Sequence, residues 1–393
     1  MKLKEICENI TDGSHNPPSG IEGSEYLMLS SKNVFNDKIT LEEPRYLSEE
    51  QFLVEDKRTC IKAGDVLMTI VGTVGRAAVV TNDIPKITLQ RSVAVLHPIS
   101  DVCNSRFLMY LLQSKKKFFE QEAHGVAQKG IYLKQLSEIS VSLPAISQQE
   151  DIVDKLDRIN KIIKSRQLEL DKLDELIKAR FVELFGDAVA NPMNWPVKKL
   201  KDLSVQINSG NTPKGGSENY VEKGITFFRS QNVWKDRLEM DDIAYIDAET
   251  HASMKRSSLK HGDILMTKTG RINTENSSLG RAALYDGEDD MANVNGHVYF
   301  IRLKDGVNNK FILRILVSPE YRDLIRSVCV GGIDKRQLNK EHIEDFPIIC
   351  PPTEMVDDYV AFVKQVDKSK VAVQKALDEA QLLFDSLMQE YFG

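Results

Sequence analysis

The stretch that decides the fold is GDVLMT, residues 64–69, because the chain repeats it as GDILMT at residues 262–267. Other pairs of similar segments follow the same order in both halves. They are KLKEI (2–6) with KLKDL (199–203), SKNV (31–34) with SQNV (230–233), GRAA (75–78) with GRAA (280–283), LPA (143–145) with CPP (350–352), and FG (185–186) with FG (392–393). Chance similarity does not preserve order along a whole chain, so we infer an internal duplication.

Each copy begins with a mixed segment in which turn-forming residues separate short strand-like runs. The predicted strands are residues 26–29, 66–70 and 92–96 in the first copy and 225–228, 264–267 and 297–301 in the second. A helix-like stretch follows at residues 105–122 and again at 310–328. This order of elements predicts a β-rich α+β domain in each copy.

Each copy ends in a long helical segment with the alternating four- and three-residue apolar spacing of a coiled-coil seam. The first seam consists of Ile152, Leu156, Ile159, Ile163, Leu170, Leu173, Ile177 and Leu184, with Arg166 and Arg180 at two further seam positions. The second consists of Val356, Val360, Val363, Val366, Val373, Leu377, Ala380, Phe384, Leu387 and Tyr391. A single amphipathic helix of this length needs a partner for its apolar face, and the other copy supplies one.

We therefore predict an α+β protein in which two tandem β-rich α/β domains are joined by two long antiparallel coiled-coil helices, related by a pseudo-twofold axis. The predicted boundaries are 1–147 for the first domain, 148–186 for the central helix, 187–353 for the second domain and 354–393 for the C-terminal helix. Antiparallel pairing would put the two mixed domains at opposite ends of the helix pair.

Composition narrows the class of protein. A net charge of −6 argues against a protein that coats nucleic acid unselectively. No apolar run approaches the roughly 18 residues that a membrane span needs, and the first residues do not resemble a signal peptide. The five cysteines are scattered and the histidines lack metal-ligand spacing, which predicts a cytoplasmic chain without a metal site.

One stretch suggests catalysis. In DGSHNPPSG (12–20), Asn16-Pro17-Pro18 is similar to the loop with which amino-methyltransferases hold the exocyclic amine of a base. That loop needs an aromatic residue after the second proline, but Ser19 stands there. The second copy has NSGNTPKGG (208–216) instead, so we interpret the stretch as a turn. Phosphate-binding and nucleophile-elbow motifs are missing as well, and the glycine-rich VGTVG (71–75) lies between strand signals.

Several segments together resemble the specificity (S) subunits of Type I restriction–modification systems. They are DGSHNPP (12–18), GDVLMT with GRAA, LPAISQQEDIVDKLD (143–157) and LDELIKARFVELFG (173–186). With both copies, the resemblance covers essentially the full chain. The second helix begins with CPPTEMVDDYV (350–360), which departs from the family pattern and leaves open how symmetrically the two ends engage partners.

The resemblance implies a function for each part. Each mixed domain would be a target recognition domain that reads one half of a split, asymmetric site in double-stranded DNA, and the helices would set the distance between the half-sites. Two methylation (M) subunits and, in the full complex, restriction (R) subunits would bind the chain. The chain would be non-catalytic and without a cofactor, because S-adenosylmethionine, and ATP with Mg²⁺ for restriction, belong to the partner subunits.

Comparison of the two copies nominates loops for DNA contact, where polar and basic side chains are expected. The first group is Ser30, Ser31, Lys32 and Asn33, paired with Arg229, Ser230, Gln231 and Asn232. The second is Lys268, Arg271 and an insertion at 272–278; the third, for phosphates, is Gln128, Lys129 and Lys134 with Lys335 and Arg336. Gln and Asn suit adenine edges, whereas Arg and Lys suit guanine.

Arg76 and Arg281 occupy the two GRAA segments, which favours a structural or phosphate-binding role for both. For any one of these residues, the alternative is a solvated surface side chain.

Two other functions stay open at this stage. The first is a coiled-coil scaffold whose duplicated domains bind protein partners without DNA specificity, which the acidic net charge favours. The second is a stand-alone methyltransferase, which requires that this chain itself bind S-adenosylmethionine.

Overall fold

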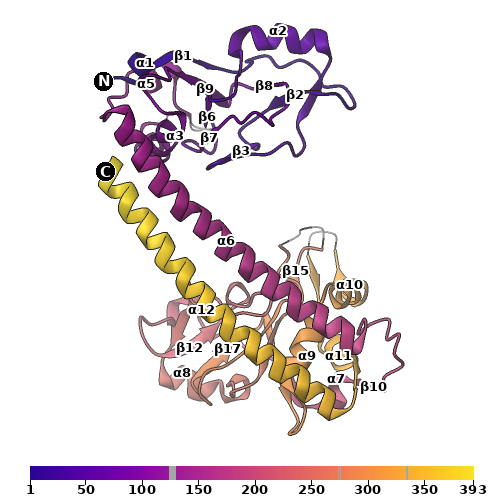
Figure 1. The fold of residues 1–393 in the computed structure, drawn as a ribbon. Helices are drawn as coiled ribbons and strands as arrows, with labels where there is room; N and C mark the ends of the chain where they lie inside the picture. The colour runs from indigo at the N-terminus through magenta and orange to yellow at the C-terminus, as the bar shows by residue number, and fades with distance from the viewer. Residues whose placement is uncertain (124–129, 273, 275, 333–334) are drawn as a thin grey trace. The chain divides into compact units, whose positions relative to one another are not determined.

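The computed structural model describes residues 1–123, 130–272, 274, 276–332 and 335–393. Two compact units are present. Unit 1 consists of Met1–Glu169 with Ala372–Gly393, and unit 2 is Leu170–Val371. Each unit holds one mixed domain together with a section of each long helix (Figure 1).

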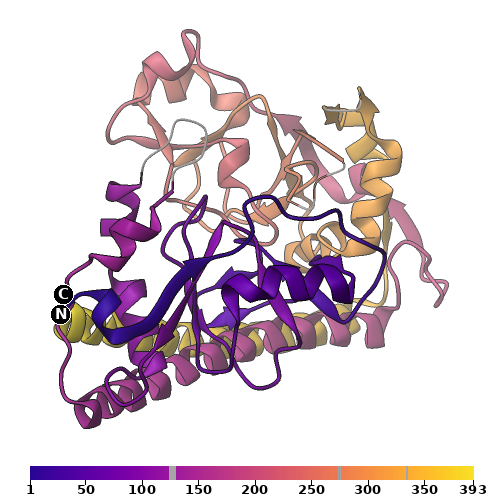
Figure 2. The same cartoon turned by 90° about the horizontal axis from the view of Figure 1, so that it is seen from above.

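The two long helices are α6 (Ile146–Phe185) and α12 (Thr353–Phe392). In unit 1 the start of α6 packs with the end of α12, and in unit 2 the end of α6 packs with the start of α12. Within each unit the two helices therefore run antiparallel and lie side by side (Figures 1 and 2). Neither has an internal Gly or Pro, and α6 stops at Gly186, whose φ of 74° suits a glycine at a helix end.

Unit 1 contains two main sheets and a small hairpin. The first sheet has the order β1 (Cys7–Asp12), β9 (Val93–Pro98), β6 (Val66–Thr69) and β7 (Ala77–Val79), with all neighbours antiparallel. The second has the order β5 (Arg45–Leu47), β2 (Tyr26–Leu29) and β8 (Ile87–Leu89), and β3 (Val34–Phe35) pairs with β4 (Lys38–Ile39). The helices of the domain are α1 (Leu3–Ile6), α2 (Glu49–Thr59), α3 (Ser105–Ser114), α4 (Lys116–Glu122) and α5 (Leu133–Ser137).

Unit 2 repeats this topology. Its first sheet has the order β11 (Ser204–Ser209), β18 (Val298–Leu303), β14 (Ile264–Thr267) and β16 (Ala282–Leu284), and its second the order β13 (Ala244–Ile246), β12 (Ile225–Phe228) and β17 (Ala292–Val294). Two smaller sheets are β15 (Thr269–Gly270), β20 (Arg336–Gln337) and β19 (Val330–Gly331), and β10 (Val197–Lys199) with β21 (Pro347–Ile349). The helices are α7 (Leu200–Leu203), α8 (Ala248–Ser253), α9 (Asn309–Leu316), α10 (Pro319–Val328) and α11 (Lys340–Glu344), with short 3₁₀ helices η1 (Gly216–Asn219), η2 (Ser230–Asn232) and η3 (Lys255–Ser257).

The repeated GDVLMT stretch forms an inner strand of the first sheet of unit 1. All four residues of β6 are buried, and successive side chains point to opposite faces. Val66 and Met68 belong to the core that also contains α3 and the long helices, whereas Leu67 packs on the second sheet. Burial of both faces explains why this strand is an unbroken apolar run. In unit 2 the side chains of β14 divide between two cores in the same way.

Two predicted helices are each interrupted. The stretch 105–122 forms α3 and α4 with a break at Lys115, and the stretch 310–328 forms α9 and α10. In the second copy the cause is local: the Ser318 hydroxyl accepts the Tyr321 N–H and caps α10, and Pro319 occupies its first turn. A continuous helix was therefore the wrong prediction for both stretches. The long helices begin at Ile146 and Thr353, close to the predicted boundaries at 148 and 354.

The duplication extends to ion pairs. Lys2 and Lys4 both form ion pairs with Glu138, and Lys199 and Lys201 both form ion pairs with Asp345. In each copy these ion pairs connect the first residues of the mixed domain to a residue near its end. A second pair differs between the copies. The Asp65 carboxylate lies 2.8 Å from Nδ1 of His97, whereas the equivalent Asp263 lies 2.7 Å from the guanidinium of Arg302.

This difference predicts that the His97–Asp65 pair makes the stability of unit 1 depend on pH, whereas the equivalent Arg302–Asp263 pair does not do so in unit 2. The hydrogen bond with Asp65 raises the pKa of His97 above its ordinary value, although burial and Lys62 oppose the shift. The ion pair therefore stabilises unit 1 fully below the ordinary histidine pKa, and this contribution is lost as the pH rises through the raised value, at about 1.4 kcal/mol per pKa unit. Hydrogen exchange of β6 and β9, corrected for intrinsic pH dependence, should show weaker protection of unit 1 at the higher pH.

The chain provides matched variants for this prediction. His97→Arg should abolish the pH dependence in unit 1, and Arg302→His should introduce it in β14 and β18 of unit 2. Unchanged pH dependence in both variants would show that another group is responsible.

Candidate nucleic-acid interface

The first group of predicted contact residues lies in a loop that follows β2 in unit 1. Asn33, which ends this loop, is only 3% exposed. Its Oδ1 accepts the Ser30 N–H at 3.0 Å, and its Nδ2 donates to the carbonyls of Thr40 (3.2 Å) and Glu42 (2.9 Å). The side-chain amide thus fastens the loop, and prediction of Asn33 as a DNA contact is wrong.

The equivalent loop of unit 2 follows β12 and has the same fastening. Asn232 is 1% exposed; its Oδ1 accepts the Arg229 N–H at 3.0 Å, and its Nδ2 donates to the carbonyls of Glu239 and Asp242. Prediction of Asn232 as a DNA contact is wrong for the same reason: its polar atoms are already hydrogen-bonded and lie away from solvent.

The other residues of the unit 1 loop differ in how far their side chains are exposed to solvent. Ser30 and Ser31 are half-buried, and the Ser31 N–H donates to the Ser92 hydroxyl at 3.1 Å. Lys32 is exposed and lines a hollow of about 440 Å³ together with Gln90, Arg45 and Tyr46. Among the described residues, no hydrogen bond holds the Lys32 or Gln90 side chain, so both can contact a ligand.

In unit 2 an acidic residue holds the corresponding side chains. The Arg229 guanidinium lies 3.1 Å from the Asp242 carboxylate and over the Tyr220 ring, and Nε2 of Gln231 donates to the same carboxylate at 2.9 Å. These two interactions, that of Gln231 first, lower the pKa of Asp242. Ser230 is half-buried beside them. Arg229 and Gln231 therefore have to leave Asp242 before they can contact DNA.

The structure also places a further candidate position that the sequence analysis missed. Gln90 directly follows β8 and donates its N–H to the Leu29 carbonyl (2.8 Å), and Asn295 directly follows β17 and donates its N–H to the Phe228 carbonyl (2.9 Å). Both residues therefore lie directly beside the loop that follows β2 or β12, with an amide side chain of different length. Comparison of the repeats between the GRAA segments and the last strand would have found them, followed by Arg91 in the first copy and Gly296 in the second.

The arginines of the GRAA segments differ in exposure. Arg76 is half-buried over the Phe35 ring at 5.0 Å. Arg281 is 8% exposed, lies 3.9 Å from the centre of the Trp234 ring and donates to the carbonyls of Ser277 and Asn276. Burial lowers its pKa. Arg281 therefore has a structural role, which is one of the two roles that its GRAA segment favours, and its buried guanidinium is not placed to contact DNA.

The second and third groups meet in unit 2. β15 pairs with β20, which puts Gly270 opposite Arg336, and the Leu338 N–H donates to the Lys268 carbonyl. Lys268 lies over the Tyr299 ring, Arg336 donates to the Cys329 carbonyl, and Arg271 and Lys335 are exposed. In unit 1 Lys134 is exposed, whereas Gln128 and Lys129 lie outside the described residues, as do residues 273 and 275 of the insertion.

The DGSHNPPSG stretch is a turn against the sheet. A Cβ on Gly13 would lie 2.0 Å from the Leu89 carbonyl oxygen, and a Cβ on the equivalent Gly210 would lie 1.7 Å from that of Val294. Glycine is required in both copies because the backbone of one segment passes directly over the other. The carbonyls of Pro18 and Ser19 accept hydrogen bonds from Arg45 and Gln51.

In the part of the chain that the structure describes, no three or more His, Cys, Asp or Glu side chains are grouped so that they could hold a metal ion, and no helix is long and apolar enough to span a membrane.

Comparison with known proteins identifies the family. The family model for the Type I restriction modification DNA specificity domain matches residues 1–174 and 192–380, one match for each copy. The chain belongs to this family. Each match covers one mixed domain and part of the long helix that follows it.

The curated relatives are specificity subunits of type I restriction enzymes. The EcoBI subunit of Escherichia coli is 28% identical over 156 residues, 39% of this chain and 31% of the relative. The MjaVIII subunit of Methanocaldococcus jannaschii is 20% identical over 307 residues, 73% of this chain and 71% of the relative. The matches to EcoBI and to the putative MjaX subunit of the same archaeon span less than half of those relatives.

Solved structures have the same fold. The S subunit of a type I system from M. genitalium matches with a TM-score of 0.57 at 14% identity, covering 100% of this chain and 95% of that one. A chain from a study of complex assembly and conformational transition of the type I R-M system matches with a TM-score of 0.56 at 16% identity, covering 100% and 96%.

The fastening role of the two asparagines predicts a loss of stability. Asn33→Ala and Asn232→Ala each leave one backbone N–H and two carbonyls without their partner, so each should lower the free energy of unfolding by about 1–3 kcal/mol. Lys32→Ala, in the same loop, should leave it within about 0.5 kcal/mol. Chemical denaturation of the full-length variants measures both, and equal stabilities for Asn33→Ala and Lys32→Ala would contradict the assignment.

Proposed function

We propose that this chain is the DNA-recognition subunit of a Type I restriction–modification complex, in which each mixed domain reads one half of a bipartite, asymmetric site in double-stranded DNA. Two methylation subunits and, in the full complex, restriction subunits bind to it, and the chain determines where they act. The reaction chemistry belongs to those partners, with S-adenosylmethionine for methylation and ATP with Mg²⁺ for restriction, and the complex works in the cytoplasm.

One observation supports this function most directly. The two reading loops share a backbone held by Asn33 and Asn232, yet the exposed side chain within it changes from Lys32 to Gln231. The neighbouring amide changes from Gln90 to Asn295. A retained frame with exchanged polar side chains is what two readers of different DNA sequences require, since the side chains at the major-groove edge determine which base is bound.

The frame also suggests what each half reads. Lysine donates to the O6 and N7 acceptors of guanine, and glutamine and asparagine bind adenine through two hydrogen bonds. Unit 1 therefore combines a guanine-type with an adenine-type contact. Unit 2 combines a guanine-type contact of Arg229 with adenine-type contacts of Gln231 and Asn295, once Arg229 and Gln231 have left Asp242 and the Asn295 Oδ1 has left the His297 N–H. Basic side chains at Lys134, Lys268, Arg271 and Lys335 would hold phosphates.

Selection from randomised duplex DNA by the full-length chain, bound to a methylation subunit, tests the proposal. The wild type should select two short conserved blocks separated by a spacer of fixed length. Lys32→Ala should relax one block and Gln231→Ala the other, each by roughly 1–3 kcal/mol per lost base contact. The exposed Lys57→Ala, on α2, serves as the control and should change neither block.

Other outcomes would contradict parts of this account. Equal weakening of both blocks by Lys32→Ala would indicate a phosphate contact and remove the base-reading assignment. A wild-type complex without salt-sensitive DNA binding would refute the function itself and favour the protein scaffold.

A further inference from the structure

Each reading loop is one end of a short hairpin whose other end carries an aspartate. In unit 1 the hairpin runs from Asn33 through β3 and β4 to Thr40, whose N–H donates to the Asn33 carbonyl at 2.8 Å. In unit 2 the Glu239 N–H donates to the Asn232 carbonyl at 2.8 Å in the same way. Asp37 and Asp236 stand at the tips.

The two aspartates share an uncommon backbone conformation. Asp37 has φ of 55° and Asp236 has φ of 62°, in the left-handed region that non-glycine residues seldom adopt. The Asp37 N–H donates to the Ala77 carbonyl (3.0 Å), and the Asp236 N–H donates to the Ala282 carbonyl (2.8 Å). Each hairpin tip is thereby fixed to the edge strand of its sheet, β7 or β16.

In unit 1 the Asp37 side chain connects the hairpin to two helices. Its carboxylate lies 2.9 Å from the Arg106 guanidinium on α3. On the long helix α6 it accepts a hydrogen bond from the Asn160 amide at 3.0 Å and lies 2.5 Å from the Lys164 ammonium. The side chain is 15% exposed, so these charged contacts are partly shielded from water.

Arg106 extends this connection. It also lies 2.5 Å from the carboxylate of Asp157, one turn before Asn160 on α6, and the Tyr110 hydroxyl donates to the same carboxylate at 2.6 Å. Residues of α3, the hairpin and α6 therefore form one continuous polar network in unit 1.

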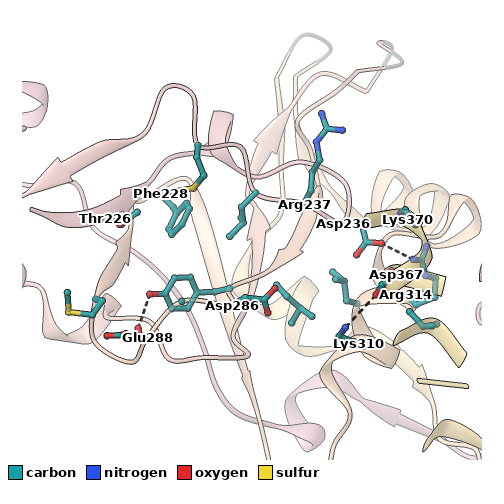
Figure 3. A pocket seen from close by; sticks show the side chains of 18 of the residues that line it. Thr226, Phe228, Asp236, Arg237, Asp286, Glu288, Lys310, Arg314, Asp367 and Lys370 are labelled. Carbon is teal, nitrogen blue, oxygen red and sulfur yellow. Dashed lines mark hydrogen bonds and ion pairs between the residues drawn. The ribbon is translucent and has the colours of Figure 1, made fainter. Parts of the chain in front are cut away.

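In unit 2 the corresponding contact is less extensive. The Asp236 carboxylate lies 2.8 Å from the Arg314 guanidinium on α9, and its side chain is 42% exposed. A hollow of about 740 Å³ adjoins this pair, and Arg314, Lys310, Asp367 and Lys370 line it (Figure 3). Lys370 and Lys310 pair with other carboxylates, those of Asp174 and Asp367.

We propose that Asp37 and Asp236 are positioning residues, of which Asp37 holds the hairpin of unit 1 on the long helix α6 and Asp236 holds the hairpin of unit 2 on α9, and that they so set the spacer length at which both half-sites bind. This inference rests on the proposed function. The aspartates act through the hairpin, because the tip that they anchor and the loop that reads DNA are its two ends. Asp37 has the larger effect, since it bonds directly to α6.

The test compares spacer preference with half-site preference. Full-length chain in complex with a methylation subunit is titrated with duplexes that carry the wild-type half-sites at the selected spacer and at spacers one base pair shorter and longer. Asp37→Ala should reduce the preference for the selected spacer by roughly tenfold, equivalent to about 1.4 kcal/mol. Discrimination against altered bases in either half-site should stay unchanged.

Matched variants complete the design. Asp236→Ala should reduce the spacer preference less than Asp37→Ala, and the exposed Asp101→Ala and Asp241→Ala serve as controls in the two units. If Asp37→Ala does not fold, Lys164→Ala and Asn160→Ala remove the contacts with α6 while the Arg106 ion pair remains, and the double variant should also broaden the spacer preference.

The inference and the proposed function fail in different ways. An Asp37→Ala or Lys164→Ala/Asn160→Ala chain that keeps the full spacer preference overturns the positioning role. Lost base discrimination at an unchanged spacer preference overturns it too, because Asp37 would then act only on the reading loop. A wild-type complex without any bipartite preference refutes the proposed function before the variants are compared.

Discussion

The constraint on which the structure depends is the burial of the apolar stripe on two helices of 40 residues each. A helix of that length with one apolar face is not stable alone in water. Each helix buries its apolar face in two ways. It packs against the other helix, and its final phenylalanine packs into a mixed domain: the ring centre of Phe185 lies 5.0 Å from that of Phe311 of α9, and the ring centre of Phe392 lies 5.1 Å from that of Phe107 of α3. The fold of each domain is thus completed by the long helices.

Much of this architecture could be predicted because it repeats. The strand positions, the two long helices and the turn at DGSHNPPSG follow from residues that both copies need for the same physical reason, such as Gly13 and Gly210 at a close backbone contact. The aromatic contacts of Phe181, Phe185 and Tyr359 were not predicted, because a period-seven seam places the coiled-coil face but not the face that meets the domain. The break before Pro319 depends on local capping by Ser318, which apolar spacing does not report.

The sequence could locate the candidate interface, but it could not show which of its residues contact a ligand and which support the fold. A retained polar residue is consistent with both ligand contact and structure, and only the hydrogen bonds of Asn33, Asn232 and Arg281 show that these three are structural. Conversely, comparison of the repeats could have nominated Gln90, but only the structure shows that it lines a hollow together with Lys32. Asp37 and Asp236 carry no sequence signal besides their equivalent position, since their role depends on a left-handed backbone and on helices distant in the chain. The two copies retain the asparagines that hold the loops and differ in the side chains that the loops expose to solvent.

The most direct measurement of the central claim is sequencing of methylated DNA from host cells with and without this chain, and with its two recognition domains exchanged in order. The account predicts one bipartite methylated motif that disappears when the chain is deleted and whose two halves trade places when the domains are exchanged. A methylation pattern that stays the same after deletion, or a motif that ignores the exchange, would contradict it.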